Sequence, residues 1–299
     1  MPSVSVVMSV HNAWCYVAEA IRSVLAQTHR EFEFIIADDG STDGTLDILQ
    51  EFERQDSRLR VLARQKSGIV DSVNAAIASS SGEYIARHDA DDVSHPQRLE
   101  KQAAFLDANP GIVAVGSRLE LIDPYGSPIG LSEHKLTHAE IEADLLRGSG
   151  WALPQPAAMM RRGGFEQAGR YSNKYTWSED LYLFLRMAQV GKLANLPEPL
   201  VKYRRHLESV NHQRHEQQDR NAIEIVREIM QQRGMPVPQE MKLMRWKPLP
   251  AAQQLRQWAW LALNAGNVRI ARKHARKVMR MQPLSIESWR VMYCALRGR

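Results

Sequence analysis

The sequence has few cysteines and no long apolar run. Its 299 residues include two cysteines, too few for a disulfide scaffold and in keeping with a reducing compartment. No apolar run approaches the roughly 18 residues needed to span a bilayer, and Met1-Pro2-Ser3 lacks the basic start of a signal peptide. The 44% hydrophobic content and the scattered glycines and prolines exclude disordered and low-complexity classes. We therefore expect a globular cytoplasmic protein.

Acidic residues are scarce near the C-terminus. Residues 242–299 contain 13 Lys and Arg but a single acid, Glu287, so this segment carries +12 and the other 241 residues carry −7 of the net charge of +5. Such segregation predicts a basic region that serves an anionic partner. Anionic lipid headgroups suit it better than nucleic acid, because it lacks a recognised nucleic-acid-binding module. Its tryptophans are candidate membrane anchors or, alternatively, core residues of a small helical bundle: Trp246, Trp258, Trp260 and Trp289.

Short apolar runs alternate with helical periodicity through the first hundred residues, which is the pattern of a parallel sheet with crossover helices. The run at 4–10 is nearly continuous and rich in β-branched residues, as expected of a strand buried on both faces. Asn12 is the expected N-cap of the helix that follows. Further strands are predicted at 32–37, 60–63, 84–88 and 112–116, with helices from Asp43, around Ile69 and from Pro96.

The pattern changes in the second half of the chain. A helix is predicted at 178–190 and an extended segment at 197–206, with only helices beyond. Residues 250–296 are similar to a single tetratricopeptide-like helical pair, which cannot form a repeat array alone. The expected fold is an α/β domain over residues 1–210, with a mostly parallel sheet flanked by helices, and a basic C-terminal α-helical appendage over residues 211–299.

Carboxylates gather where two predicted strands end. Asp38 and Asp39 close the second strand, and Asp89, Asp91 and Asp92 follow the fourth. Ligands bind at the carboxyl ends of strands in an open parallel sheet. The sequence has neither a glycine-rich dinucleotide fingerprint after these strands nor a GxxxxGK phosphate loop. Because acids repel phosphates, a phosphate ligand here requires a divalent cation between them.

Asp89-Ala90-Asp91 has the spacing that a hard cation requires. Alternate residues of an extended or turning segment point the same way, so both carboxylates can reach one Mg²⁺ or Mn²⁺. The cation would neutralise a nucleoside diphosphate leaving group as its bond breaks. An exposed acidic turn is the alternative interpretation.

Four motifs follow one another along the chain: VSVVMSVHN at 4–12, ADDGSTD at 37–43, YIARHDADD at 84–92 and SED at 178–180. Together they resemble the inverting family 2 glycosyltransferases of the GT-A type, over residues 2–206. The resemblance implies a Rossmann-like GT-A fold, a nucleotide-sugar donor and a divalent metal ion.

The resemblance also implies roles for individual residues. Asp39 accepts a hydrogen bond from the nucleotide base, and Asp38 does not face the ligand because successive strand side chains point oppositely. His11 lies beside the base, where the family usually has tyrosine. The other implied donor contacts are Val10, Asn12, Asn74, Asp89 and Ala90, and the implied metal ligand is Asp91. Asp89 would reach the ribose or a metal-bound water, while turn or cap roles for the strand-two acids and a surface position for Asn74 are the alternatives.

Asp180 is the implied general base. In a single displacement, one carboxylate on the acceptor side takes the proton of the attacking hydroxyl. Its predicted place at a helix N-terminus favours the ionised form. Glu179 competes for the role, a structural cap is the alternative, and Trp177 is a candidate border of the acceptor sugar.

The sequence therefore predicts an inverting, metal-dependent glycosyltransferase that uses a UDP-sugar and extends a glycan or lipid-linked acceptor in surface polysaccharide synthesis. We expect it in the cytoplasm, attached peripherally to the inner face of the plasma membrane, with no nucleic-acid partner. Two rival hypotheses stay open. A sugar-nucleotide nucleotidyltransferase should carry a Gly- and Arg/Lys-rich loop in place of His11-Asn12-Ala13-Trp14, and a non-catalytic glycan-binding or scaffold protein could retain the fold.

Overall fold

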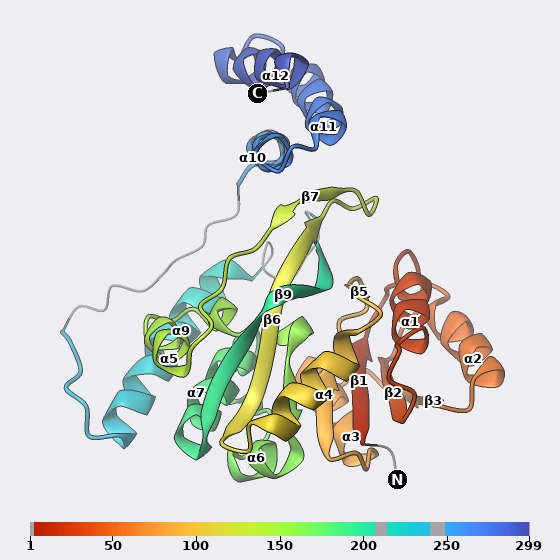
Figure 1. The fold of residues 1–299 in the computed structure, drawn as a ribbon, viewed down its shortest axis with the longest axis vertical. Coiled ribbons are helices and arrows are strands. Elements are labelled where there is room, and N and C mark those ends of the chain that lie inside the picture. Colours follow the sequence, from red (N-terminus) through yellow and green to blue (C-terminus); the bar gives the residue numbers. More distant parts are fainter. Residues whose placement is uncertain (1–2, 207–213, 240–248, 299) are drawn as a thin grey trace. The chain divides into compact units, whose positions relative to one another are not determined.

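The computed structural model describes residues 3–206, 214–239 and 249–298, which divide into two compact units (Figure 1). The first unit comprises residues 1–118, 134–201 and 216–245, and the second comprises 119–133, 202–215 and 246–299. This division differs from the boundary predicted at residue 210. Of the described residues, 216–239 group with the sheet-containing unit, and the hairpin segment 119–133 groups with the C-terminal helices.

The chain alternates strands and helices through its first hundred residues, as the periodicity predicts. The strands are β1 (Val4–Val10), β2 (Phe32–Asp39), β3 (Leu59–Arg64), β4 (Tyr84–Arg87), β5 (Val93–Ser94), β6 (Ile112–Ile122), β7 (Pro128–Leu131), β8 (Met159–Arg161) and β9 (Lys192–Arg204). The helices that accompany them are α1 (Val17–Leu25), α2 (Thr45–Gln55), α3 (Ile69–Ala78), α4 (Arg98–Ala108), α5 (His138–Leu145), α6 (Arg162–Gln167), α7 (Glu179–Val190) and α9 (His215–Gln232).

The strands form one mixed sheet in the order β3-β2-β1-β4-β8-β6-β9-β5, with β7 paired to β6. β1 pairs in parallel with both β2 and β4, and β2 pairs in parallel with β3. β8 is antiparallel to both β4 and β6. The predicted α/β fold with helices flanking a sheet is therefore confirmed, and the sheet is mixed: β1 to β4 pair in parallel, and the pairs that β8 makes beyond β4 are antiparallel.

Helices cover both faces of the sheet in the first unit (Figure 1). Along β1, Val7 packs with residues of α3, α7 and α9 in one core, while Val6 and Met8 pack with residues of α1 and α4 in the other. Alternate side chains of a strand point to opposite faces, so a strand covered on both sides is apolar throughout. The near-continuous apolar run at 4–10 follows from this burial.

Asn12 does not cap the first helix, contrary to the prediction. The residue that precedes α1 is Tyr16, and Asn12 adopts a left-handed conformation with φ 52°. Its Oδ1 accepts the Thr42 N–H at 2.9 Å, while its own N–H donates to Ser41 Oγ at 3.0 Å. Asparagine tolerates this conformation better than most residues. Asn12 therefore joins the loop after β1 to the loop after β2.

The second unit packs three helices, α10 (Ala251–Asn264), α11 (Val268–Met281) and α12 (Ile286–Arg297), around a core of mostly small residues. Trp258 is buried, with its ring 5.4 Å from that of His274, so it is a core residue and the membrane-anchor prediction for it is wrong. Trp246, another predicted anchor, lies outside the described residues. None of the helices in the described ranges combines the length and apolar character of a bilayer-crossing segment.

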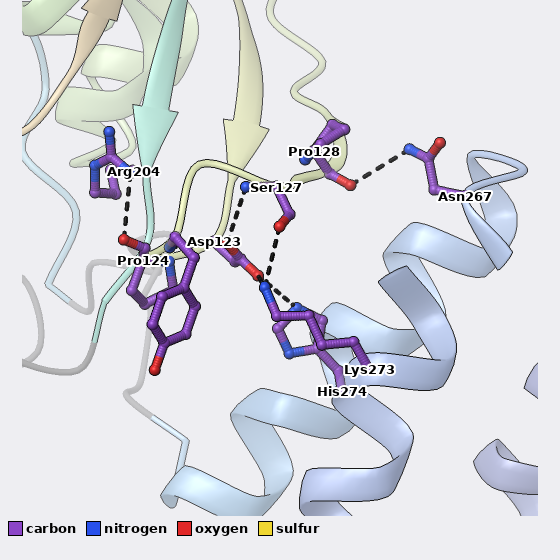
Figure 2. Close-up of polar contacts among 9 residues, drawn as sticks. Asp123, Pro124, Ser127, Pro128, Arg204, Asn267, Lys273 and His274 are labelled. Carbon is purple, nitrogen blue, oxygen red and sulfur yellow. Dashed lines mark hydrogen bonds and ion pairs between the residues drawn. The ribbon is translucent and has the colours of Figure 1, made fainter. Parts of the chain in front are cut away.

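A buried carboxylate joins the β6–β7 turn to α11 within the second unit (Figure 2). Asp123 is fully buried, and its Oδ2 accepts from Lys273 Nζ at 2.6 Å and lies 3.1 Å from His274 Nε2. Its Oδ1 accepts the backbone N–H groups of Tyr125 and Ser127, each at 2.9 Å. The same carboxylate thus shapes the turn and holds the helix against it.

Replacing Lys273 tests this junction. Lys273→Gln removes the ammonium from a buried carboxylate, and we expect it to lower the free energy of unfolding of α10–α12 by about 2 kcal/mol, because Lys273 keeps partial solvent access. Native-state hydrogen exchange of the helix amides measures the change. Lys277→Gln is the matched control: Lys277 lies 4.5 Å from the Tyr125 ring on the same helix, and its loss should change stability by less than about 0.5 kcal/mol. Equal effects of the two substitutions would contradict the assignment.

The same carboxylate predicts an acid-sensitive second unit. Burial raises the pKa of Asp123, but the donors from His274, Lys273 and the turn amides outweigh it, so this pKa lies well below its usual value. A carboxyl with a depressed folded pKa contributes stability above its unfolded pKa of about 3.9 and loses it as the pH falls toward the folded value. We therefore expect the protection of α11 amides to fall below about pH 4. Asp123→Asn should flatten this dependence, and a pH profile unchanged by that substitution would refute the prediction.

Candidate active site

Three parallel strands of the first unit end at one edge of the sheet. β1 lies between β2 and β4, with Val10 opposite Asp38 and Val7 opposite Arg87. Parallel neighbours present their carboxyl ends on the same side, so the loops after β1, β2 and β4 share this edge. The structure therefore places these predicted site residues along one edge: Val10, His11, Asn12, Asp39, Asp89, Ala90 and Asp91.

Asp39 binds the segment between β3 and α3. Its Oδ1 accepts from the Ser67 N–H at 2.7 Å and from Ser72 Oγ at 2.8 Å, and its Oδ2 accepts the Gly68 N–H at 3.0 Å. Burial raises the pKa of Asp39, but these hydrogen bonds lower it by more. The pKa of Asp39 therefore lies below its usual value, and the carboxyl stays ionised. Asp39 therefore fixes the loop that begins α3. An oxygen with one such bond can still accept another donor.

The adjacent carboxylate and the loop after β1 make different contacts. Asp38 Oδ2 accepts the Ser41 N–H at 3.1 Å, so the neighbouring acids of β2 bind different segments, as expected of successive strand residues. His11 is exposed, and its Nε2 lies 3.1 Å from Lys66 Nζ. Val10 is buried in the core, which leaves its backbone as the part that a ligand could contact.

Asn74 connects α3 to the segment before α7. Its Nδ2 donates to the Tyr171 carbonyl at 2.9 Å. Tyr171 is buried, and its pKa is raised first by that burial, with further contributions from the charges of Glu179 and Asp180. Asn74 thus helps to hold the segment around Tyr171, which lies within reach of the charges of the α7 carboxylates.

A buried guanidinium interacts with three of the acids near this edge. Arg87 is the last residue of β4 and is 1% exposed, and its Nη2 lies 3.2 Å from Asp89 Oδ1. Its charge also acts on Glu179 and Asp180 in the first turn of α7. Asp89 interacts in turn with the charges of Asp91 and Asp180. The structure therefore brings the predicted metal-site acids and the predicted base into one cluster, while the described contacts of Asp39 are with residues 67–72.

Burial raises the pKa values of three of these acids. It raises the pKa of Glu179 to about 7, with the charge of Asp180 adding to the effect. It also raises the pKa of Asp180, because burial and the charge of Asp89 outweigh the N–H of Leu181, which donates to Asp180 Oδ1 at 2.7 Å. Burial raises the pKa of Asp89 as well, although Arg87 lowers it. At Asp180, burial and the charge of Asp89 therefore oppose the effect expected of the helix N-terminus. A base with a raised pKa accepts a proton more readily.

A second buried arginine binds the backbone at the end of β4. Arg98, on α4, donates from Nη2 to the Arg87 carbonyl at 2.6 Å and from Nη1 to Ser94 Oγ at 3.1 Å. His88 is also buried, and its Nδ1 donates to the Asp89 carbonyl at 2.7 Å. Burial, followed by the charge of Arg98, lowers the pKa of His88 to about 3, so its ring is neutral at physiological pH. These groups fix the backbone from which Asp89 and Asp91 project.

A glycine and a tryptophan with unusual backbone geometry lie close to Asp180 in space or in sequence. A Cβ added at Gly150 would lie 3.1 Å from Asp180 Oδ2, so a larger residue there would press against this carboxylate. Trp177, immediately before Ser178 and α7, has φ 74°, a conformation that costs free energy for a bulky residue.

The acids after β4 could supply some of the ligands of a hard cation, but not a full set. Among the described residues, no group of three or more His, Cys, Asp or Glu is arranged to hold a metal ion. Mg²⁺ typically takes one or two protein carboxylates and completes its shell with water and substrate phosphates. Asp89 and Asp91 fit that requirement, because they are two nearby carboxylates whose charges interact.

Sequence reasoning missed Arg87, the cation on which the cluster depends. The signal was a basic residue that ends an apolar strand directly before a run of acids, in Tyr84-Ile85-Ala86-Arg87-His88-Asp89. It also missed the loop at Ser67 that Asp39 binds, since nothing in the local pattern joins residues 28 positions apart.

Comparisons with known proteins agree on one family. Residues 5–169 match the family model described as glycosyl transferase family 2. An uncharacterized glycosyltransferase of Haemophilus influenzae is 34% identical over 76% of this chain and 73% of its own length. A Bacillus subtilis protein named as a putative teichuronic acid biosynthesis glycosyltransferase, TuaG, is 42% identical over 35% of this chain and 42% of its own.

A solved structure with the same fold is that of S. aureus TarS residues 1–349 in complex with UDP-GlcNAc. It superimposes with a TM-score of 0.58 over 99% of this chain and 80% of that one, at 17% sequence identity. At this identity the likeness concerns the fold.

Removing the central guanidinium should destabilise the first unit. Arg87→Met leaves the neighbouring carboxylates without their buried cation, and it removes a donor to the His88 carbonyl and one of two donors to the Val7 carbonyl, so we expect a loss of about 3 kcal/mol. Urea unfolding of the full chain measures it. Arg64→Met is the matched control, because Arg64 also ends a strand but is exposed, and it should change stability by less than about 0.5 kcal/mol. A loss at Arg87 no greater than at Arg64 would show that the cluster does not need this cation.

Proposed function

The chain belongs to glycosyl transferase family 2 and is a glycosyltransferase, and from that premise we propose an inverting, metal-dependent transfer of a sugar from a UDP-sugar to a glycan or lipid-linked acceptor. The observation that carries the proposal is the cluster at the sheet edge in which Asp89 pairs with Arg87 and interacts with the charges of Asp91 and Asp180. In one site, Asp89 and Asp91 are available to hold a cation, and Asp180 is available to take the proton of the acceptor hydroxyl.

The donor binds along the ends of β1, β2 and β4 in this proposal. Asp39 accepts from the base, and His11 and Asn12 line the same part of the edge. Val10 and Ala90 contribute backbone, and Asp89 reaches the ribose. Asn74 contributes through the Tyr171 segment that it holds. Support comes from the shared fold of TarS, whose structure contains UDP-GlcNAc.

Asp91, with Asp89 beside it, would hold Mg²⁺ or Mn²⁺. When bound, the cation would supply Lewis-acid neutralisation of the diphosphate leaving group. The chain's own contribution at Asp89 is Arg87, whose charge lowers the pKa of that carboxyl against the larger effect of burial. Arg98 and His88 fix their backbone.

Asp180 is the general base in this scheme. The acceptor oxygen attacks the anomeric carbon, the bond from that carbon to the diphosphate oxygen breaks with its electron pair going to the diphosphate, and the hydroxyl proton passes to Asp180. One displacement inverts the configuration at the anomeric carbon. Glu179, whose pKa burial raises to about 7, is the competing candidate for this role.

The acceptor is assigned to a surface polysaccharide. The support is the similarity to the Bacillus subtilis protein whose name places it in teichuronic acid biosynthesis. We place the reaction in the cytoplasm, where sugar nucleotides are available to an enzyme of this kind.

Substitution of the acids separates their roles. Asp180→Asn should lower the rate of UDP release from a UDP-sugar and acceptor by about 10²- to 10⁴-fold, because the hydroxyl loses its base, while donor affinity is unchanged. Asp91→Asn should instead weaken Mn²⁺-dependent donor binding, measured as the thermal shift over a panel of sugar nucleotides.

Asp47→Asn is the matched control, since Asp47 is an exposed acid in the first turn of α2 and should leave both quantities unchanged. Near-normal turnover in Asp180→Asn with loss in Glu179→Gln would transfer the base role to Glu179. Absence of nucleotide release with every donor in the panel would refute the proposed reaction.

A further inference from the structure

The outer side of α12 exposes large apolar side chains. Ile286 is 82% exposed, and Trp289, Tyr293 and Leu296 are each more than half exposed. Their spacing of three and four residues puts them on one side of the helix, the α12 outer face, while Ser288, Val291 and Ala295 on the other side are buried. Leu284, just before the helix, is 95% exposed. Contiguous apolar side chains of this size mark a binding surface rather than ordinary solvent-facing residues.

Basic side chains border this face. Arg290 and Arg297 fall on the same side of the helix by their spacing from Ile286 and Tyr293, and Arg297 Nη1 donates to the Tyr293 hydroxyl at 2.6 Å. Across residues 251–297, all of which are described, there are nine Lys and Arg against one acid, Glu287. The partner of the α12 outer face must therefore be apolar within and anionic at its boundary.

A second copy of the chain does not meet that requirement. A symmetric contact would place the α12 outer face against itself, with Arg290 and Arg297 facing the same residues of the partner and like charges opposed. Nucleic acid would satisfy the arginines but would leave Leu284, Ile286 and Leu296 without a matching surface. The interface of an anionic bilayer satisfies both, since acyl chains take the aliphatic side chains, the interfacial layer takes Trp289 and Tyr293, and the headgroups take the arginines.

We propose that the α12 outer face inserts into the interfacial layer of an anionic lipid membrane, with Leu284 entering beside it. The site consists of α12 and Leu284, two residues before the helix. It does not depend on the transfer reaction, and Trp258, buried in the core of the same unit, takes no part.

Co-sedimentation of the full chain with vesicles tests the proposal without donor, acceptor or metal, so its outcome is independent of the transferase assay. Binding is expected to vesicles of phosphatidylcholine with 30% phosphatidylglycerol, to be much weaker with phosphatidylcholine alone, and to decline with salt. Leu284→Ser combined with Ile286→Ser should weaken binding at least tenfold, because these two side chains are the most exposed and contribute least to folding. Arg290→Gln combined with Arg297→Gln should also weaken it at least tenfold.

Trp14→Ser is the matched control for Trp289→Ser, because the two tryptophans are equally exposed, at 58% and 59%, and Trp14 belongs to the first unit. Only Trp289→Ser should reduce binding. Absence of binding to anionic vesicles, or binding unchanged in the Leu284/Ile286 variant, would overturn the proposal. So would a dimer in solution that the same variant dissociates, since the face would then join two copies.

Discussion

One buried guanidinium makes the acidic edge of the sheet possible. Carboxylates removed from water favour their neutral forms, and burial raises the pKa values of Asp89, Glu179 and Asp180 accordingly. Arg87 opposes this effect at all three, and its own position is held by the end of β4 and by Arg98 from α4. Acids kept partly ionised in a confined site can bind a cation or accept a proton, whereas protonated acids can do neither.

In the second unit, burial and hydrogen-bond donors also act in opposite directions on the pKa of a carboxyl, but there the donors prevail. Asp123 is as deeply buried as Arg87, but its pKa is lowered because Lys273, His274 and two turn amides converge on it. That carboxylate has no oxygen to spare and holds a helix in place. Burial alone therefore does not distinguish a functional acid from a structural one; the number and charge of its donors does.

Much of the fold follows from local pattern. The apolar run at 4–10 and the acids after 32–37 and 84–88 predict parallel strands whose carboxyl ends carry polar groups, and β1, β2 and β4 have that arrangement. Asn12 was beyond such reasoning, because its left-handed conformation depends on contacts with Ser41 and Thr42 some 30 residues away. Among the tryptophans, Trp258 and Trp289 share a basic helical region, yet only helix packing makes one core and the other surface.

The amino-acid sequence by itself determined the family, the alternation of strands and helices, the acids at the strand ends and the basic character of the C-terminal region. Each of these depends on residues close together in the chain, or on their order. Only the tertiary structure decided that Arg87 stands among Asp89, Glu179 and Asp180, that Asp39 binds the Ser67 loop, and that α12 keeps an apolar side outward. The reason is physical: desolvation, charge balance and exposure are properties of neighbours in space, and these neighbours are distant in sequence.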